Sequence, residues 1–402
     1  MAGNDVEGDT LAPYRVEFDP AAIDDLRGRL EHVRWPESET VEDWSQGAPL
    51  DFVQDLVRYW RRDYDFDAAA ARMNAWPNFI TRVDDVDIHF VHARSPEPDA
   101  LPLVISHGWP GSFLEYLDVI GPLTDPASHG GDPRDAFHVV CPSLPGYGFS
   151  GRPSTRGRGL PWIADAWSTL MARVGYDRYG AQGGDWGSAV TAILGEAHRD
   201  RVIGIHINMP TVALPVPDEN TTEQERRNYE DFQLHTSWGT GYQHVQSTRP
   251  QTLGYGLVDS PVGQLAWIVE KFCAWTDCDG DPYTLFTREQ LLDNATLYWF
   301  TATAASSARL YWESAGPAAW SDPASAAILR MGQVTVPTGC SVFPRELRRP
   351  SRRQAERRFV NLHYWNEPAK GGHFAAFEQP ALFVDEVRAS FRSLRKWDPR
   401  RG

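Results

Sequence analysis

A series of short apolar segments, separated by longer stretches of helical character, constrains the fold most. These segments span residues 103–106, 137–141, 179–182 and 202–207. Short apolar runs that alternate with helices are typical of parallel strands buried on both faces. The alternation stops near Thr211, and the chain then reads as several helices rich in Trp, Tyr and Phe up to about Ala327. We therefore predict an α/β fold with a mostly parallel central sheet and a helical insertion.

The segments on either side of this pattern complete the predicted organisation. Asp19 and Pro20 supply a side-chain cap and a fixed backbone dihedral for the start of a helix. Further elements are expected as helices near 52–62 and 380–394 and as strands near 80–94, 333–336 and 359–364. We divide the chain into a helical N-terminal region packed on the core (1–80), a first core part (81–212), a helical cap or lid (213–328) and a second core part (329–402).

The balance of charges limits the partners of the chain. Its 402 residues carry a formal net charge of −15, and no basic stripe with interleaved aromatic residues is present. Because such a charge repels polyanions, we expect no nucleic-acid partner. The one basic run, 345–358, also contains Glu346 and Glu356. We interpret this run as a solvated helical face rather than as an anion-binding patch.

Cysteine and histidine spacing argues against a metal site. The four cysteines form no C-x-x-C pair. His89 and His92 lie three apart in an expected strand, so their side chains point to opposite faces. The polar, acidic stretch 1–13 lacks the features of a signal peptide, and no segment is apolar enough to span a bilayer. We therefore expect a cytoplasmic protein with free thiols, no metal and no membrane anchor.

Residues 180–187, GAQGGDWG, carry the strongest chemical signal. An apolar strand precedes them, a helix follows them, and Gly183 and Gly187 flank Asp185 two positions to either side. A tight strand–turn–helix needs small neighbours so that the central side chain stands exposed at the top of the sheet. An aspartate in that position attacks carbon and forms an ester with the enzyme. The alternative interpretation is a turn aspartate that caps the following helix.

Residues 107–112, HGWPGS, form a glycine-rich turn directly after an expected strand. Such a turn can direct the backbone N–H of Trp109 into a site. There it would form an oxyanion hole together with the N–H of Trp186. The alternative is a turn that packs a tryptophan side chain. His107 is interpreted as structural because it follows the strand directly.

His373, in KGGHF, is the candidate base. It lies beside two glycines in a loop after the last expected strand and before the closing helix. When the chain order is nucleophile, acid and histidine, the acid follows a strand between Asp185 and His373. Glu346, in FPRE, is the first candidate, with Glu356 and Glu367 as lesser ones. The alternative for Glu346 is a surface glutamate in an Arg-rich helix.

Several of these motifs resemble the microsomal-type epoxide hydrolases. They are HGWPGS (107–112), QGGDWG (182–187), FPRE (343–346), GGHFAAFEQP (371–380) and an N-terminal segment, 19–37, that ends in RWPE. The resemblance covers the chain from about residue 15 to its end, and it implies an α/β-hydrolase fold with a helical lid. It also implies hydrolysis of an epoxide to a vicinal diol without a cofactor.

The family's functional residues map onto particular positions of this chain. The resemblance implies Asp185 as nucleophile, His373 as base and Glu346 as the partner of that base. It also implies that Tyr242 and Tyr311, in the lid, hold the epoxide oxygen. Spacing alone does not distinguish these two tyrosines from Tyr255, Tyr283 and Tyr298.

The composition and the N-terminus add details to this resemblance. A composition rich in Ala, Arg and Asp and poor in Lys is typical of a bacterial protein. The chain is also similar to epoxide hydrolases of enediyne antibiotic biosynthesis, and we expect it to have no N-terminal anchor of the kind found in the microsomal members. We expect a small-molecule epoxide, aromatic or bulky and apolar, as its substrate, and we leave a homodimer open.

A haloalkane dehalogenase is the competing interpretation, since it shares the fold and the aspartate nucleophile. Trp109 and Trp186 would then serve as halide donors. The lid tyrosines favour an epoxide, because a departing halide needs no proton. A serine esterase conflicts with Asp185 at the turn, and a non-catalytic protein has no reason to carry Glu346 and His373 at matching places.

Overall fold

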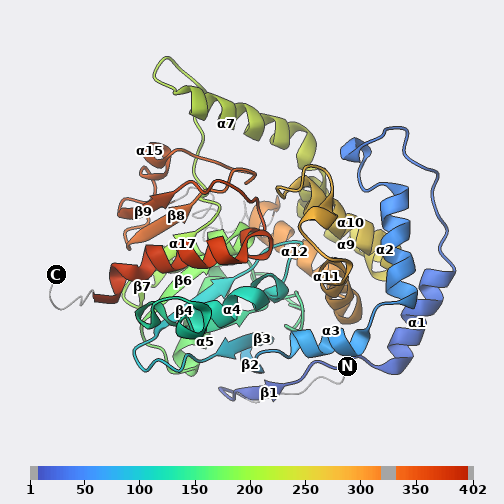
Figure 1. The fold of residues 1–402 in the computed structure, drawn as a ribbon, viewed down its shortest axis with the longest axis horizontal. Coiled ribbons are helices and arrows are strands. Elements are labelled where there is room, and N and C mark those ends of the chain that lie inside the picture. Colours follow the sequence, from blue (N-terminus) through green and yellow to red (C-terminus); the bar gives the residue numbers. More distant parts are fainter. Residues whose placement is uncertain (1–7, 318–331, 397–402) are drawn as a thin grey trace.

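The computed structural model describes residues 8–317 and 332–396, which form a central sheet flanked by helices (Figure 1). Within them the sheet has nine strands in the order β1-β2-β3-β5-β4-β6-β7-β8-β9. Pairs from β1 to β3 and between β3 and β5 are antiparallel, and pairs from β5 through β4 to β9 are parallel. The predicted α/β fold with a mostly parallel sheet is confirmed. The strands are β1 (Ala12–Tyr14), β2 (Asn78–Val83), β3 (Val86–Ala93), β4 (Leu101–Ser106), β5 (Phe137–Pro142), β6 (Tyr179–Gly183), β7 (Val202–Ile207), β8 (Thr338–Ser341) and β9 (Leu362–Asn366).

Three strand predictions differ from the structure at their boundaries. The expected strand 359–364 is β9 at Leu362–Asn366, preceded by an isolated bridge at Phe359. The expected strand 80–94 is a hairpin of β2 and β3, and the chain turns at Asp84 with a φ of +52°. The expected strand 333–336 contributes an isolated bridge at Val334, and β8 begins after Pro337. Because proline has no N–H to donate, regular pairing starts at the next residue.

Helices cover both faces of the sheet. α4 and α17 pack together on one face, and α5 and α6 pack together on the other. Along β4, Leu103 and Ile105 belong to the apolar cluster that contains α4 and α17, and Val104 belongs to the cluster that contains α5 and α6. Burial of both faces explains why the strands read as continuous apolar runs. These helices are α4 (Leu117–Thr124), α5 (Leu160–Arg173), α6 (Asp185–Ala197) and α17 (Pro380–Arg392).

The N-terminal region reaches both the sheet and the insertion. The Asp19 side chain accepts a hydrogen bond from the backbone N–H of Ala21, as expected for the start of α1. α1 and α2 contact inserted helices, and Arg72 of α3 forms a two-point ion pair with Asp293 of the inserted helix α11 (Arg288–Thr301). β1 extends the edge of the sheet. The N-terminal helices are α1 (Pro20–Glu31), α2 (Leu50–Arg62) and α3 (Phe66–Met73).

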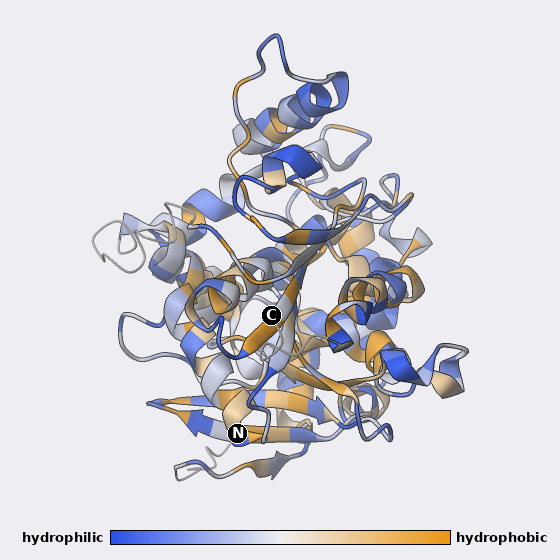
Figure 2. Cartoon of the chain, turned by 90° about the vertical axis from the view of Figure 1, so that its left-hand side faces the viewer, coloured by the Kyte–Doolittle hydropathy of each residue, from blue (hydrophilic) through white to orange (hydrophobic). Residues whose placement is uncertain are grey.

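Between β7 and β8 the chain leaves the sheet and forms a group of helices. One of them, α7, projects from the rest and is mostly hydrophilic, whereas the strands are mainly hydrophobic (Figures 1 and 2). Residues 318–328, the end of the predicted lid, lie outside the described residues. Along the described ranges no helix combines the length and apolarity needed to cross a bilayer. The inserted helices are α7 (Glu223–Leu234), the π-helix η5 (His235–Gly239), α8 (Gly241–Thr248), α9 (Pro250–Asp259), α10 (Pro261–Ala274), α11 (Arg288–Thr301) and α12 (Ala304–Ala315).

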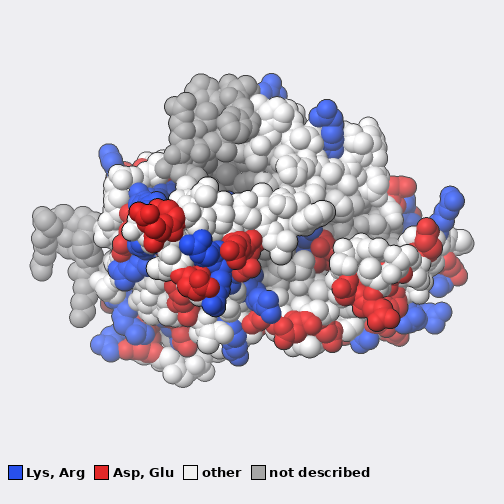
Figure 3. Space-filling view, turned by 90° about the horizontal axis from the view of Figure 1, so that it is seen from above, with Lys and Arg blue, Asp and Glu red and all other residues white. Residues whose placement is uncertain are grey.

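The prediction of a solvated helical face in the basic run 345–358 is wrong. A short helix, α15 (Arg352–Ala355), is the only helical part of it, and Arg358 is buried. Arg353 pairs with Glu225 of α7, so the run attaches the projecting helix to the core. Its acidic partner lies far away in the sequence, which hides the pairing from local reasoning. Seen from above, acidic and basic side chains lie in small mixed groups (Figure 3).

Candidate active site

Asp185 lies at the turn between β6 and α6. Its φ of +50° is a backbone conformation that residues other than glycine rarely adopt. Neither flanking glycine has room for a side chain. A β-carbon on Gly183 would lie 2.1 Å from the carbonyl oxygen of Gly187, and one on Gly187 would lie 1.9 Å from that of Ser106. The turn after β6 therefore lies tightly against α6 and against the end of β4. The structure has the turn geometry expected at 180–187.

The two carboxylate oxygens of Asp185 have different neighbours. Oδ1 accepts a hydrogen bond from the backbone N–H of Trp109 at 2.9 Å. Oδ2 lies 3.3 Å from Nε2 of His373. The described part of the chain shows no corresponding hydrogen bond from the N–H of Trp186 to the carboxylate. One oxygen is thus held by a backbone donor while the other faces an imidazole.

His373 connects Asp185 to a buried glutamate. Its Nδ1 lies 2.7 Å from Oε1 of Glu346, and both side chains are almost fully buried. The two lesser candidates lie elsewhere. Glu356 forms an exposed ion pair with an arginine, and Glu367 accepts a hydrogen bond from a nearby tryptophan. Of the three glutamates considered from the sequence, the structure brings Glu346 to the histidine.

The charges around His373 favour its protonated form. Burial by itself lowers the pKa of this imidazole, because it disfavours the charged state. The carboxylates of Glu346 and Asp185 outweigh burial and raise the pKa of His373 well above its ordinary value. In the resting protein an imidazolium therefore lies between two carboxylates.

Tyr242 of α8 and Tyr311 of α12 meet the loop and helix that hold Asp185. The Tyr242 ring stacks on Trp109 with ring centroids 5.0 Å apart, and the Tyr311 ring lies edge-on to Trp186 at 4.7 Å. The two tyrosine rings are 5.8 Å apart. Burial raises the pKa of both hydroxyls, so both remain protonated at neutral pH.

The other tyrosines considered from the sequence have different surroundings. The buried Tyr298 donates a hydrogen bond to the carbonyl oxygen of Gly111 at 2.9 Å. Tyr283 donates to Asp55 at 3.0 Å, and Tyr255 is largely exposed. Of the five tyrosines, the two implied by the resemblance are therefore the ones that lie together beside Asp185.

Comparison with known proteins identifies the family. Residues 11–116 match the family described as "Epoxide hydrolase N terminus", and residues 102–241 match the "alpha/beta hydrolase fold" family. A protein of Stigmatella aurantiaca named as an epoxide hydrolase is 50% identical over 96% of this chain and 86% of its own length. Epoxide hydrolase 1 of Sus scrofa is 34% identical over 95% of this chain and 88% of its own length. The chain belongs to the epoxide hydrolase family.

Solved structures of other members match the fold of this epoxide hydrolase. The juvenile hormone epoxide hydrolase from the silkworm Bombyx mori has a TM-score of 0.88 and 29% identity, covering 96% of this chain and 95% of that one. The Aspergillus niger epoxide hydrolase has a TM-score of 0.83 and 29% identity, covering 96% and 97%. The expected α/β-hydrolase fold is confirmed.

Sequence reasoning missed Trp275, which follows α10 in this epoxide hydrolase. Its ring centroid lies 5.0 Å from that of His373 and 5.1 Å from that of Tyr242. Its carbonyl oxygen accepts a hydrogen bond from the backbone N–H of His373 at 2.9 Å. Trp275 thus joins the lid to the histidine loop. No motif marks it among the 16 tryptophans of the chain.

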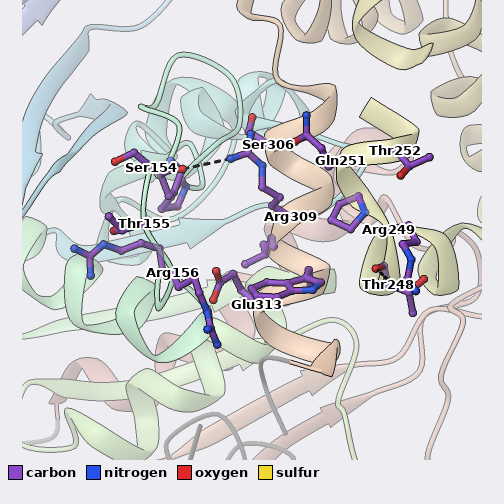
Figure 4. Close-up of a pocket in the computed structure, with 16 residues that line it drawn as sticks. Ser154, Thr155, Arg156, Thr248, Arg249, Gln251, Thr252, Ser306, Arg309 and Glu313 are labelled. Carbon is purple, nitrogen blue, oxygen red and sulfur yellow. Dashed lines mark hydrogen bonds between the residues drawn. The ribbon is translucent and has the colours of Figure 1, made fainter. Parts of the chain in front are cut away.

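The residues around Asp185 border a small cavity, and a much larger cavity lies elsewhere in this epoxide hydrolase. A cavity of about 10 Å³ borders Asp185 and His373. A larger one of about 430 Å³ lies between α12, the start of α9 and the loop after β5, and Arg156, Arg309 and Glu313 line it (Figure 4). The candidate residues around Asp185 do not line this larger cavity. The described residues contain no group of three or more His, Cys, Asp or Glu side chains that could hold a metal ion.

Proposed function

We propose that this epoxide hydrolase works through a covalent ester on Asp185. The surroundings of the Asp185 carboxylate support this proposal most. Oδ1 accepts a hydrogen bond from the backbone N–H of Trp109 at 2.9 Å, and Oδ2 lies 3.3 Å from Nε2 of His373. In the first step a carboxylate oxygen bonds to an epoxide carbon and the ring C–O bond breaks. The departing oxygen takes a proton from Tyr242 or Tyr311. Their raised pKa values keep both phenols protonated until that moment.

Hydrolysis of the ester is the second step. His373 takes one proton from water, and the water oxygen bonds to the carboxyl carbon of Asp185. The N–H of Trp109 stabilises the oxyanion. The bond between that carbon and the product oxygen then breaks, and the product oxygen takes the proton from His373. The second proton of the water, left on the new carboxyl group, then passes to His373 and restores the resting imidazolium, so that epoxide and water yield a vicinal diol.

Ester formation prepares His373 for this second step. The charge of Asp185 helps to raise the pKa of His373, and the ester no longer carries that charge. Once the ester has formed, the imidazolium therefore gives up its proton more readily, and that proton restores the tyrosine that protonated the departing oxygen. Glu346 remains as the counter-ion when His373 takes a proton from water.

We infer a bulky, apolar epoxide as the substrate. Aromatic rings of Trp109, Trp186, Trp275 and the two tyrosines surround the reacting carboxylate. The similar Bombyx mori protein is named as a juvenile hormone epoxide hydrolase. A role in bacterial natural-product biosynthesis, a cytoplasmic location and a homodimer stay predictions.

Haloalkane dehalogenation is the alternative that an assay should exclude. The nucleophile and the tryptophans would suit it, but a halide leaves without a proton and gives the two tyrosines no task. Incubation with 1-chlorohexane should release no chloride, while styrene oxide should yield its diol under the same conditions. Chloride release at a comparable rate would favour the alternative.

The covalent mechanism is tested by stopping it halfway. A His373→Gln variant should react once with styrene oxide and then stall, and intact-mass spectrometry should show one adduct on the peptide that contains Asp185. In the wild type, a single turnover in ¹⁸O-labelled water should place the label on Asp185, because water attacks the carboxyl carbon. If the diol carries the label in that turnover and the variant builds no adduct, water attacks the epoxide directly and the proposal is wrong.

A further inference from the structure

Glu115 is a buried carboxyl group with no task in the mechanism described above. It lies in the short 3-10 helix η2 (Phe113–Tyr116) that follows the HGWPGS turn, and it is 9% exposed. The backbone of Ser112 interacts with its carboxyl group. Within the described structure its Oε1 atom is buried without a hydrogen-bond partner. Because buried polar atoms are nearly always paired, such an atom calls for an explanation.

The unpaired oxygen belongs to the group that borders the reaction centre. Glu115 lines the cavity of about 10 Å³ together with Asp185 and His373. That volume accommodates about one water molecule, which needs two to four polar partners. Nε2 of His373 is also buried without a hydrogen bond, apart from its 3.3 Å approach to Asp185. The cavity thus offers a water molecule an imidazole nitrogen and a carboxyl oxygen beside the carboxylate that becomes the ester.

A neighbouring glycine gives this carboxyl group its place. A β-carbon on Gly111 would lie 1.5 Å from Oε1 of Glu115, so any side chain at 111 would displace the carboxyl group. Glu378, another buried glutamate nearby, differs in its surroundings. Its oxygens accept hydrogen bonds from the backbone N–H groups of Phe374 at 2.9 Å and Asp277 at 3.0 Å. Glu378 therefore holds two loops together, whereas Glu115 has an oxygen available.

The surroundings of Glu115 keep it neutral at pH 7. Burial raises the pKa of Glu115 to about 8, against the attraction of His373 and with the help of the negative charge on Asp185. An ionised Glu115 would add a negative charge beside His373 and hold its proton in place. The neutral acid can accept a hydrogen bond without stabilising the protonated form of His373. The titratable groups that interact with Glu115 are Asp185, His373, Glu378, Tyr116, Cys141 and Tyr298.

We propose that Glu115 positions the water that hydrolyses the enzyme ester. The water donates one hydrogen bond to His373 and another to the carbonyl oxygen of Glu115. In this orientation a lone pair of the water oxygen points toward the carboxyl carbon of Asp185. His373 removes the proton, and Glu115 stays neutral throughout. This role rests on the proposed function, because it needs an ester to hydrolyse. It makes Glu115 specific to the second half-reaction.

Pre-steady-state kinetics with styrene oxide separate the two half-reactions. Tryptophan fluorescence reports ring opening beside Trp109 and Trp186, and rapid-quench intact mass reports decay of the ester. Glu115→Leu keeps the size of the side chain but removes the hydrogen bond. It should slow ester decay at least tenfold and leave ring opening within about twofold. Leu114→Val, in the same short helix, is the packing control and should leave the ratio of the two rates unchanged.

The pH dependence provides a second, independent readout. Ester decay in the wild type should fall above about pH 8 as Glu115 ionises, whereas Glu115→Gln should keep most of the rate at pH 7 and lose this alkaline decline. The Gln variant also decides the matter if Glu115→Leu does not fold. The idea is overturned if a folded Glu115→Leu slows both half-reactions equally, if it leaves ester decay unchanged, or if Glu115→Gln retains the alkaline decline. Absence of any adduct in His373→Gln would instead overturn the covalent mechanism itself.

Discussion

Asn294 of the lid helix α11 offers a test of how the lid supports the reacting loop. Its Nδ2 donates a hydrogen bond to the carbonyl oxygen of Pro110 at 2.8 Å, and its Oδ1 accepts one from the hydroxyl of Ser112 at 2.8 Å. Both hydrogen bonds are buried, and they involve residues close to Trp109 in the same turn. The side chain therefore holds the turn whose backbone N–H contacts Asp185. Replacing Asn294 with Leu keeps the approximate volume and removes both hydrogen bonds.

The expected magnitudes follow from these contacts. The substitution leaves two buried groups unpaired, and each costs about 1–3 kcal/mol of folding stability. Ser112 keeps one contact, since its Oγ also accepts from the backbone N–H of Leu114 at 3.3 Å. We therefore expect a loss of about 2–4 kcal/mol in the free energy of unfolding. Removing an oxyanion donor slows catalysis by about 10²–10³, so a displaced donor at Trp109 should slow ester hydrolysis by about 10-fold to 100-fold.

Urea denaturation and single-turnover kinetics measure the two effects separately. Thr301→Val is the matched control, because Thr301 lies on the same helix and its hydroxyl bonds to Leu297 and Thr303 rather than to the loop. It should lower stability without slowing ester hydrolysis. The reasoning is refuted if Asn294→Leu loses stability as expected but hydrolyses the ester at the wild-type rate. In that case the lid would not determine the position of the Trp109 N–H.

Three further predictions address the nucleophile, the tyrosines and the projecting helix. Asp185→Ala should abolish diol formation while the protein stays folded, and more than a few per cent of residual turnover in a folded variant would contradict its role. Tyr242→Phe and Tyr311→Phe should each slow ring opening by about 10²–10⁴, non-additively because both act on one oxygen, as stopped-flow fluorescence can show. Wild-type ring opening in both would make the tyrosines packing residues. A hydrogen bond from Arg353 lowers the pKa of Glu225 to about 2, so this pair stabilises the protein above pH 4.5 and its contribution is lost as pH falls toward 2. Glu225→Gln should remove that part of the acid dependence in thermal melts, and an unchanged profile would argue against it.

The sequence by itself determined the features that depend on neighbours along the chain. Gly183 predicts a tight turn because the contact that its missing side chain avoids is with Gly187, four residues further along the chain. Asp19 predicts the start of α1 because a cap bonds to residues within the same turn. The apolar runs predict strands buried on both faces because each run is hydrophobic along its whole length. The candidate nucleophile, acid and histidine could be assigned in chain order because each follows an expected strand.

Tertiary structure decided which of several similar side chains meet. The sequence left Glu346 beside Glu356 and Glu367 as alternatives, and the structure places Oε1 of Glu346 2.7 Å from His373. It likewise brings the tyrosines of α8 and α12 together beside Asp185, a choice that spacing could not make.

The same limit explains the errors and omissions. The basic run 345–358 is not a solvated helical face, because Arg349 and Arg353 pair with acidic residues of α7, more than a hundred residues away. Trp275 and Glu115 carried no local signal, since their significance comes from the elements packed around them. Burial, hydrogen bonding and charge pairing at these positions depend on distances between segments remote in sequence. Local chain chemistry determines turns and helix starts, but the folded arrangement determines these distances.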